Sequence, residues 1–320
     1  TLSSRRAGYR LKNMSQPNST PTPKLFYTNL NSVRVSVYAS IDDKFCWADG
    51  WRIDGDVYGP HCKLSDTLPA RIKLQDLGAG KSPLSSAIVP DPCPWSAELP
   101  ATYKVTTNIS QKDKLIQSNV QQLAFKTLTT NSGKLQLTDL NGFTKRWVLR
   151  AAAGTVSSAL SDGGEACREL RLSRIIVDPD TDDYSRATEQ GLWIIAVCNP
   201  SESTLQQQLD SLSPWPCVAC CILPAETDLN NIQQPDDLLL GTYITNNQVV
   251  PDWAELIIAD AIDPIKFNSR WDSSVIPVIA HQLTSYNNDR NAREKCAALQ
   301  ASLAPRTNYA GYVISKQPLY

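Results

Sequence analysis

Two short apolar segments in the second half of the chain end in polar side chains that suit acid–base chemistry. Residues 217–226 read CVACCILPAE and end in Glu226, and residues 276–282 read IPVIAHQ and end in Gln282. Two carboxylates about 5 Å apart at such strand ends can cleave a glycosidic bond, one as acid/base and one as nucleophile. An amide is a poor nucleophile, so this chain offers only the first of the two groups.

The composition describes a folded and nearly neutral chain. Its 320 residues are 42% hydrophobic and 20% charged, which suits two globular domains. The 31 basic and 32 acidic residues give a net charge of −1, so no long-range field favours nucleic acid or an anionic membrane. We expect a carbohydrate or a protein as partner, and the oligomeric state stays open.

The positions of the cysteines and the sequence of the N-terminus predict the cellular compartment. Several of the nine cysteines lie inside apolar runs: Cys198, Cys217, Cys220 and Cys221. This pattern is typical of reduced, buried thiols, so we expect a cytoplasmic protein. No apolar run reaches the roughly 18 residues of a membrane helix. The N-terminus lacks the apolar core of a signal peptide.

The potential metal ligands do not form a recognisable pattern. His61 and His281 are the only two histidines, which excludes sites built on several His ligands. Cys46, His61, Cys62 and Cys93 do not have the spacing of a compact zinc site. No G-x-G-x-x-G sequence follows an expected strand. We therefore expect no metal and no organic cofactor.

The first half of the chain predicts a polar arm followed by a β-domain. Residues 1–24 are rich in Ser, Thr, Asn and Pro and predict a disordered arm. Over residues 25–140, polar and apolar side chains alternate in short runs such as 33–38, 70–74 and 101–105, separated by Gly, Asp and Pro turns. This pattern predicts an antiparallel β-sandwich of about seven strands.

Residues 141–320 predict a parallel sheet that closes into a short (βα)8 barrel. Eight apolar, β-rich runs recur there: 147–149, 174–177, 192–197, 217–223, 238–240, 255–259, 275–280 and 309–314. Helix-compatible stretches at 183–191 and 289–303 lie between them. The length is small for a barrel, so some helices must be brief or replaced by loops. A doubly wound open sheet is the competing fold.

Polar residues at the C-terminal ends of these strands are candidate ligand contacts, because ligands of such barrels bind there. Asp178 follows the second run, and His281 ends the seventh. Asp178 precedes a proline, so ordinary turn chemistry is the alternative for it. Arg150 follows the first run and could instead pair with Asp178.

Two segments resemble glycoside hydrolase family 2. WSAELPATYKV at residues 95–105 resembles the "W-S-P-E-x-P-x-L-Y-x-V" segment of that family's immunoglobulin-like domain. NGFTKRWVLR at residues 141–150 is similar to its "F-x-L-N-G-K-x-x-x-L-R-G" passage into barrel strand 1. The resemblance implies an immunoglobulin-like sandwich followed by a TIM-type barrel. Residues 1–24 cannot form the jelly-roll domain that usually comes first.

The same resemblance assigns roles to single residues. Glu226 matches the acid/base at the end of strand 4, but Ala225 replaces the Asn that normally precedes it. Gln282 stands where the family nucleophile, a Glu, would end strand 7. Arg150 matches a motif residue of the cleft, and Ser315 stands where an aromatic residue would floor the sugar site.

Two functions follow from the resemblance. The first is a catalytically impaired member, a pseudoenzyme that acts as a carbohydrate-binding or protein-scaffolding module. The second is an active O-glycosyl hydrolase in which Glu226 is the general acid and Asp260 or Asp263 replaces the nucleophile. A third interpretation is an interaction protein that binds no sugar and keeps only the fold.

Overall fold

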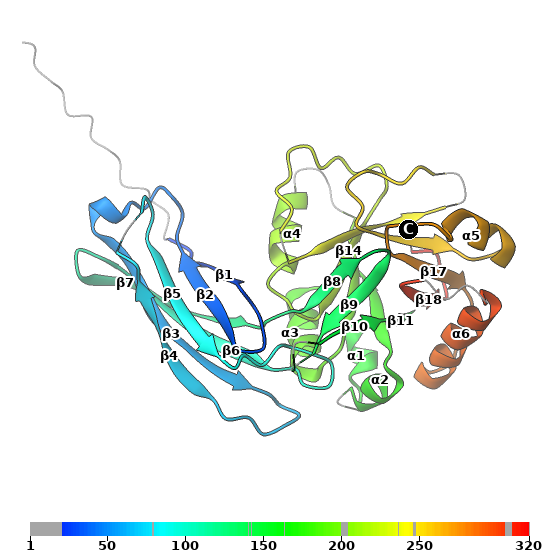
Figure 1. Ribbon diagram of the computed structural model, residues 1–320, viewed down its shortest axis with the longest axis horizontal. Coiled ribbons are helices and arrows are strands. Elements are labelled where there is room, and N and C mark those ends of the chain that lie inside the picture. Colours follow the sequence, from blue (N-terminus) through cyan, green and yellow to red (C-terminus); the bar gives the residue numbers. More distant parts are fainter. Residues whose placement is uncertain are drawn as a thin grey trace, which may run out of the picture.

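The computed structural model consists of an antiparallel β-domain and a closed β/α barrel, joined by a small sheet (Figure 1). It describes residues 21–319 except 79, 140, 142, 163, 200–203, 236, 246–247 and 305–308. The arm expected over residues 1–24 therefore lies outside the described residues up to residue 20, and the first strand begins at Lys24.

The β-domain is a curled antiparallel sheet of seven strands in the order β1-β2-β5-β4-β3-β6-β7. Its strands are β1 (Lys24–Thr28), β2 (Arg34–Ser40), β3 (Trp51–His61), β4 (Ala70–Asp76), β5 (Leu84–Pro90), β6 (Thr102–Gln111) and β7 (Lys114–Leu123). β4 pairs with β5 over only two residue pairs, so the sheet bends there. The bend folds β2 and β5 over β3 and β6 as in a sandwich, and Val37, Ile53 and Val105 share the resulting core.

A three-stranded antiparallel sheet, which the sequence analysis did not anticipate, connects the two larger units. It consists of β8 (Leu128–Asn131), β9 (Lys134–Thr138) and β10 (Thr144–Trp147). It spans the boundary expected between residues 140 and 141. Leu135 of β9 is buried in the barrel's core cluster, so this sheet is packed on the barrel.

Eight parallel strands, β11 to β18, close into a barrel, so the expected barrel is present and the open sheet is excluded. They are β11 (Leu149–Ala153), β12 (Ser173–Val177), β13 (Ile194–Val197), β14 (Val218–Leu223), β15 (Leu239–Ile244), β16 (Leu256–Asp260), β17 (Val278–Leu283) and β18 (Gly311–Ser315). The helices outside them are α1 (Val156–Ala159), α2 (Glu165–Leu170), α3 (Thr181–Gln190), α4 (Leu205–Leu212), α5 (Pro264–Trp271) and α6 (Asp289–Ser302). Loops connect β14 to β15 and β15 to β16.

Side-chain alternation along the strands decides which residues face the barrel interior. Ala259, Ala280 and Ile314 share a buried cluster with α5 and α6, so they lie on the outer face. Their neighbours along the strands therefore face inward. This places Asp260 at the end of β16 and Ser315 at the end of β18 inside the barrel at its C-terminal mouth.

The β-domain and the barrel meet through aromatic side chains. Trp95 is 1% exposed, and its ring meets Trp193 edge-on at a centroid distance of 4.7 Å. Trp147 packs against the same ring at 5.0 Å. Gly191, which ends α3 with φ +69°, lies so close to Ala97 that a Cβ would sit 2.1 Å from its carbonyl oxygen. The joint therefore tolerates little change in shape.

The sequence predicted buried thiols and no run long enough for a membrane helix. All nine cysteines are free thiols, and six of them are buried. Within the described part of the chain, no helix has both the length and the apolar character needed to span a bilayer.

Candidate functional site at the barrel mouth

Glu226, the expected acid/base, lies in the turn that follows β14. The turn is closed by the N–H of Thr227, which donates to the carbonyl of Pro224 at 3.0 Å. The indole of Trp253 donates to the carbonyl of Thr227 at 3.1 Å and fixes the turn from the next loop. The Glu226 side chain is exposed, and no hydrogen bond joins it to another residue in the described part of the chain.

On β17, the interior position belongs to His281 and not to Gln282. Gln282 is in register with Ile314, whose side chain packs in the outer cluster. His281 precedes it on the opposite face and pairs in register with Asp260 on β16. His281 is 1% exposed, whereas Gln282 is exposed. A count along the sequence therefore reached a residue that faces away from the interior.

Four interior side chains on consecutive strands form a hydrogen-bonded network at the mouth. His281 Nδ1 lies 2.6 Å from Oδ1 of Asp260, and His281 Nε2 lies 2.8 Å from Oγ of Ser315. Tyr243 on β15 donates its hydroxyl to Asp260, and its ring meets the imidazole at 5.6 Å in an edge-on geometry. The network thus links β15, β16, β17 and β18.

The direction of the Ser315 hydrogen bond defines the protonation of this network. The Ser315 hydroxyl donates to the carbonyl of Gln317 at 2.5 Å, so its oxygen accepts from His281 Nε2–H. Asp260 accepts from His281 Nδ1–H, because an ionised carboxylate has no proton to give. Asp260 and Ser315 are thus both acceptors toward the His281 ring.

Asp260, His281 and Ser315 are ordered as in a nucleophilic triad, but the hydrogen bond between histidine and serine has the opposite direction. A triad histidine accepts the serine proton, and the hydroxyl must be reachable by substrate. Here Ser315 is 0% exposed and directs its proton to Gln317. The structure therefore gives Ser315 the role of an acceptor that orients His281.

Asp260 is partly open to solvent, with 22% of its side chain exposed. Burial raises the pKa of Asp260, but hydrogen bonds from His281 and Tyr243 outweigh that effect, so its pKa lies below the ordinary value. Burial and the hydrogen bond to this carboxylate raise the pKa of Tyr243. The mouth therefore presents an ionised carboxylate on β16.

Asp263, the other acid named as a substitute nucleophile, caps α5 and accepts from the N–H groups of Ile265 and Lys266.

Asp178 holds the ends of β12 and β13 together. Its backbone is in the left-handed region with φ +44°, and its N–H donates to the carbonyl of Val197 at 2.9 Å. Its Oδ1 accepts from the N–H of Asn199 at 3.3 Å. The side chain is exposed at the mouth, so a ligand role for Asp178 stays a prediction.

Arg150 lies on the outer face of β11. It is in register with Tyr312 of the outer cluster, and its Nη2 donates to Gln300 of α6 at 3.0 Å. No ion pair with Asp178 is present among the described residues. The guanidinium thus contacts the helix layer, whereas the sequence predicted a contact with substrate.

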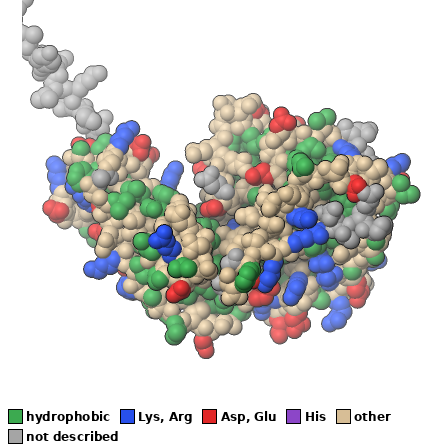
Figure 2. Space-filling view, in the orientation of Figure 1, with side chains coloured by type: hydrophobic (Ala, Val, Ile, Leu, Met, Phe, Trp, Pro, Cys, Tyr) green, Lys and Arg blue, Asp and Glu red, His purple; other side chains and the backbone are tan. Residues whose placement is uncertain are grey.

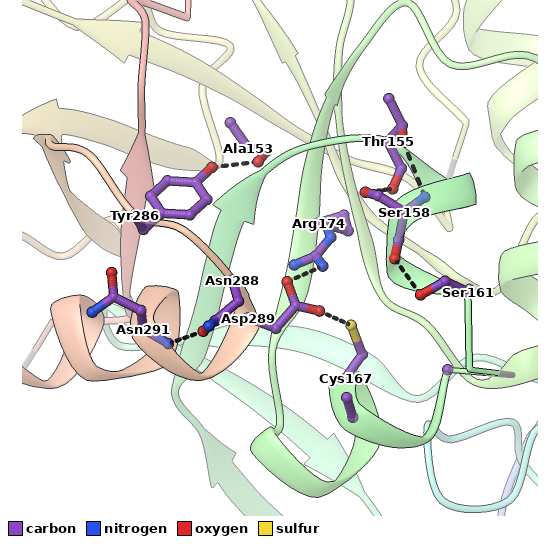
Figure 3. Close-up of polar contacts among 12 residues, drawn as sticks. Ala153, Thr155, Ser158, Ser161, Cys167, Arg174, Tyr286, Asn288, Asp289 and Asn291 are labelled. Atoms are coloured by element: carbon purple, nitrogen blue, oxygen red, sulfur yellow. Dashed lines mark hydrogen bonds and ion pairs between the residues drawn. The ribbon is translucent and has the colours of Figure 1, made fainter.

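A second polar cluster, shown in Figure 3, fixes the loop that leads from β17 into α6. The side chain of Arg174 on β12 is 3% exposed and pairs with Asp289 at 2.6 Å. Cys167 donates its S–H to the same carboxylate at 3.4 Å, and burial raises the pKa of this thiol to about 12. Tyr286 donates its hydroxyl to the carbonyl of Ala153. This cluster positions the loop but faces the helices.

Sequence reasoning singled out Glu226, Gln282 and His281 and mentioned Asp260 as a substitute acid, but it missed Tyr243. The available signal was the segment 239–244, in which Gly241 and Tyr243 share a strand face. Gly241 faces the interior, where a Cβ would lie 2.8 Å from Ile222. Tyr243 follows it two residues later, at the mouth.

The mouth offers no metal-binding cluster. Among the described residues, no group of three or more His, Cys, Asp or Glu side chains could hold a metal ion.

The sandwich-plus-barrel fold is that of solved family 2 glycosidases. A β-glucuronidase from Bacteroides uniformis has a TM-score of 0.60 at 12% identity, over 91% of this chain and 45% of that one. A glycosyl hydrolase family 2 member from Bacteroides cellulosilyticus has a TM-score of 0.62 at 11% identity, over 92% and 45%. A putative β-galactosidase from Bacteroides fragilis has a TM-score of 0.58 at 14% identity, over 91% and 54%.

These likenesses define a class of fold. The chain spans about half the length of the glycosidases that it resembles. No protein-family model matches it, and no curated protein matches its sequence. The shared property is therefore the architecture.

Proposed function

We propose that this protein is a glycosidase-type barrel that binds carbohydrate at its mouth and does not carry out retaining hydrolysis. The observation that supports this proposal is the identity of the interior residue at the end of β17. His281 occupies it, with both ring nitrogens within hydrogen-bond distance of Asp260 and Ser315. A retaining mechanism needs a free carboxylate nucleophile opposite the acid/base.

The remaining polar groups suit binding. Asp260 is ionised and partly exposed, and the carboxylates of Glu226 and Asp178 are exposed after β14 and β12. Carboxylates accept hydrogen bonds from sugar hydroxyls without any chemical step. The other role of a barrel that has lost hydrolysis would be to bind a protein partner at the same mouth.

A specific observation favours one competing function. Asp260 is an ionised, partly exposed carboxylate at the mouth, so it could accept a proton from water. With Glu226 as general acid, Asp260 could activate water in an inverting hydrolase. Inverting enzymes require about 6.5–9.5 Å between the two carboxyl groups.

Hydrolysis of a panel of aryl β-glycosides separates the two functions. We expect the wild-type protein to release no more aryl alcohol than buffer, and we expect Glu226→Gln and Asp260→Asn to be indistinguishable from it. Asp228→Asn changes another exposed acid of the same loop and serves as the control. Turnover that both test variants lose and the control retains would replace our proposal with the inverting hydrolase.

A further inference from the structure

We propose a second carbohydrate site in a groove between the β-domain and the barrel, on the side of the barrel opposite to the mouth. The ligand class is a neutral, hydroxyl-rich molecule of about two sugar rings. The groove lies between β7, where Gln121–Ala124 form one wall, and the turn from α4 into β14, where residues 213–216 form the other. Figure 2 shows the hollow between the two lobes.

Two adjoining cavities make up the groove. Their volumes are about 320 and 210 Å³, and six lining residues are common to both. The shared residues are Gln121, Gln122, Leu123, Ala124, Pro214 and Pro216. Small-molecule sites in proteins start at about 300 Å³. The combined volume therefore suits a ligand larger than one sugar ring.

The charges of the groove balance. Lys24 and Lys126 line the larger cavity together with Asp210 and Asp237. Lys126 Nζ is already engaged, because it donates to the carbonyls of Val218 at 2.6 Å and Asp237 at 3.0 Å. With two cations against two carboxylates, the lining does not select for an ion. A neutral ligand fits it best.

Hydrogen-bonding groups of both kinds are available on the two walls. The amide of Gln122 is exposed, and neither it nor the Ser213 hydroxyl has a side-chain partner in the described part of the chain. Asp210 uses Oδ1 to accept from Gln206 at 3.0 Å, which leaves its second oxygen as an acceptor. An amide, a hydroxyl and a carboxylate together match the mixed donors and acceptors of neighbouring sugar hydroxyls.

Each of the two cavities is lined by one stacked aromatic ring. Phe26 lines the larger cavity, is 41% exposed and stacks on Tyr38 at 5.1 Å with an interplanar angle of 12°. Trp215 lines the smaller cavity and stacks on Tyr184 at 5.9 Å. A ring held flat by a second ring provides an apolar platform for the C–H face of a pyranose. One such platform in each of two adjoining cavities is consistent with a ligand of two sugar rings.

This site is independent of the function proposed for the mouth. Residues 213–216 precede β14, whereas the mouth lies beyond its other end at Leu223. The barrel strands thus separate the two sites. A negative result at one site therefore does not contradict the proposal for the other site.

Calorimetric titration with cellobiose, maltose and lactose tests the groove. We expect at least one of these disaccharides to bind, and Gln122→Ala and Trp215→Phe each to weaken binding by about tenfold or more. Gln207→Ala changes an exposed glutamine on α4 that does not line either cavity, and it should leave binding unchanged. Circular dichroism of each variant checks that the fold is retained.

Three results would overturn the proposal. One is the absence of binding for all three disaccharides at millimolar concentration. Another is binding that Gln122→Ala and Trp215→Phe leave intact while Asp260→Asn abolishes it, which would place the sugar at the mouth. The last is tighter binding of glucose 6-phosphate than of the neutral disaccharides, which would show an anion site.

Discussion

Nδ1 of His281 and Oδ1 of Asp260 lie 2.6 Å apart across adjacent strands, on the interior side of the barrel mouth. This contact holds an imidazole on the interior side of the end of β17. It also commits one oxygen of the only carboxylate in the network. The consequences for protonation, acid stability and chemistry can each be measured.

The first prediction concerns the protons on His281. Because the Ser315 hydroxyl donates to the carbonyl of Gln317, we expect Nε2 of His281 to bear the proton that Ser315 accepts. Nitrogen-15 NMR of the imidazoles measures this directly, and a His61→Gln variant assigns the signals of the only two histidines. A spectrum in which Nε2 of His281 carries no proton would contradict this direction of the hydrogen bond.

The second prediction concerns stability in acid. The pKa of Asp260 is lower in the folded state, so its ionised form stabilises the protein above the ordinary pKa of about 4, and that contribution disappears as the pH falls further. Thermal unfolding should show Asp260→Asn to be less stable than wild type at pH about 7. The difference should shrink below pH about 4. A difference that is constant across this range would rule out an ionised Asp260 as its source.

The third prediction tests how tightly the β-domain and the barrel are joined. Gly191→Ala adds a Cβ that would lie 2.1 Å from the Ala97 carbonyl oxygen, at φ +69°. Gly78→Ala is the matched control, because Gly78 has φ +64° and nothing within 4 Å of its added Cβ. We expect the control to lose about 1 kcal/mol from backbone strain, and Gly191→Ala to lose about 1–3 kcal/mol more. Equal losses in urea unfolding would indicate a loose joint.

The fourth prediction concerns Lys126, the amine buried between β-domain and barrel. Burial lowers its pKa from 10.5 to about 8, so between these pH values the unfolded chain binds the extra proton and the folded protein does not. Stability should therefore rise by about 2 kcal/mol across this interval relative to Lys126→Met. Lys104→Met, at an exposed position of β6, should keep the wild-type pH dependence. Parallel curves for wild type and Lys126→Met would contradict the prediction.

The barrel could be predicted from sequence because each strand is a continuous apolar run. Residues 217–223 were expected, and β14 covers Val218–Leu223. The stretch 183–191 was expected to be helical, and α3 covers Thr181–Gln190 with Gly191 as its C-cap. Burial on both faces produces these runs, so they survive without any knowledge of partners.

The sheet β8–β10 was harder to foresee, since its strands are four or five residues long and partly polar. The site shows a second limit. The resemblance placed Gln282 at the end of strand 7, but strand alternation makes His281 the interior residue there. A sequence match alone does not fix which side chains of a strand face the barrel interior, because that depends on the strand's pairing with β16 and β18.

Covalent trapping tests the central claim most directly. A retaining glycosidase forms a glycosyl–enzyme bond through its carboxylate nucleophile, and an activated 2-deoxy-2-fluoro glycoside accumulates that intermediate. We predict that intact-mass spectrometry after incubation with gluco- and galacto-configured fluoro glycosides shows the unmodified protein mass. A glycosyl adduct that maps to Asp260, or to any other acid at the mouth, would contradict the account.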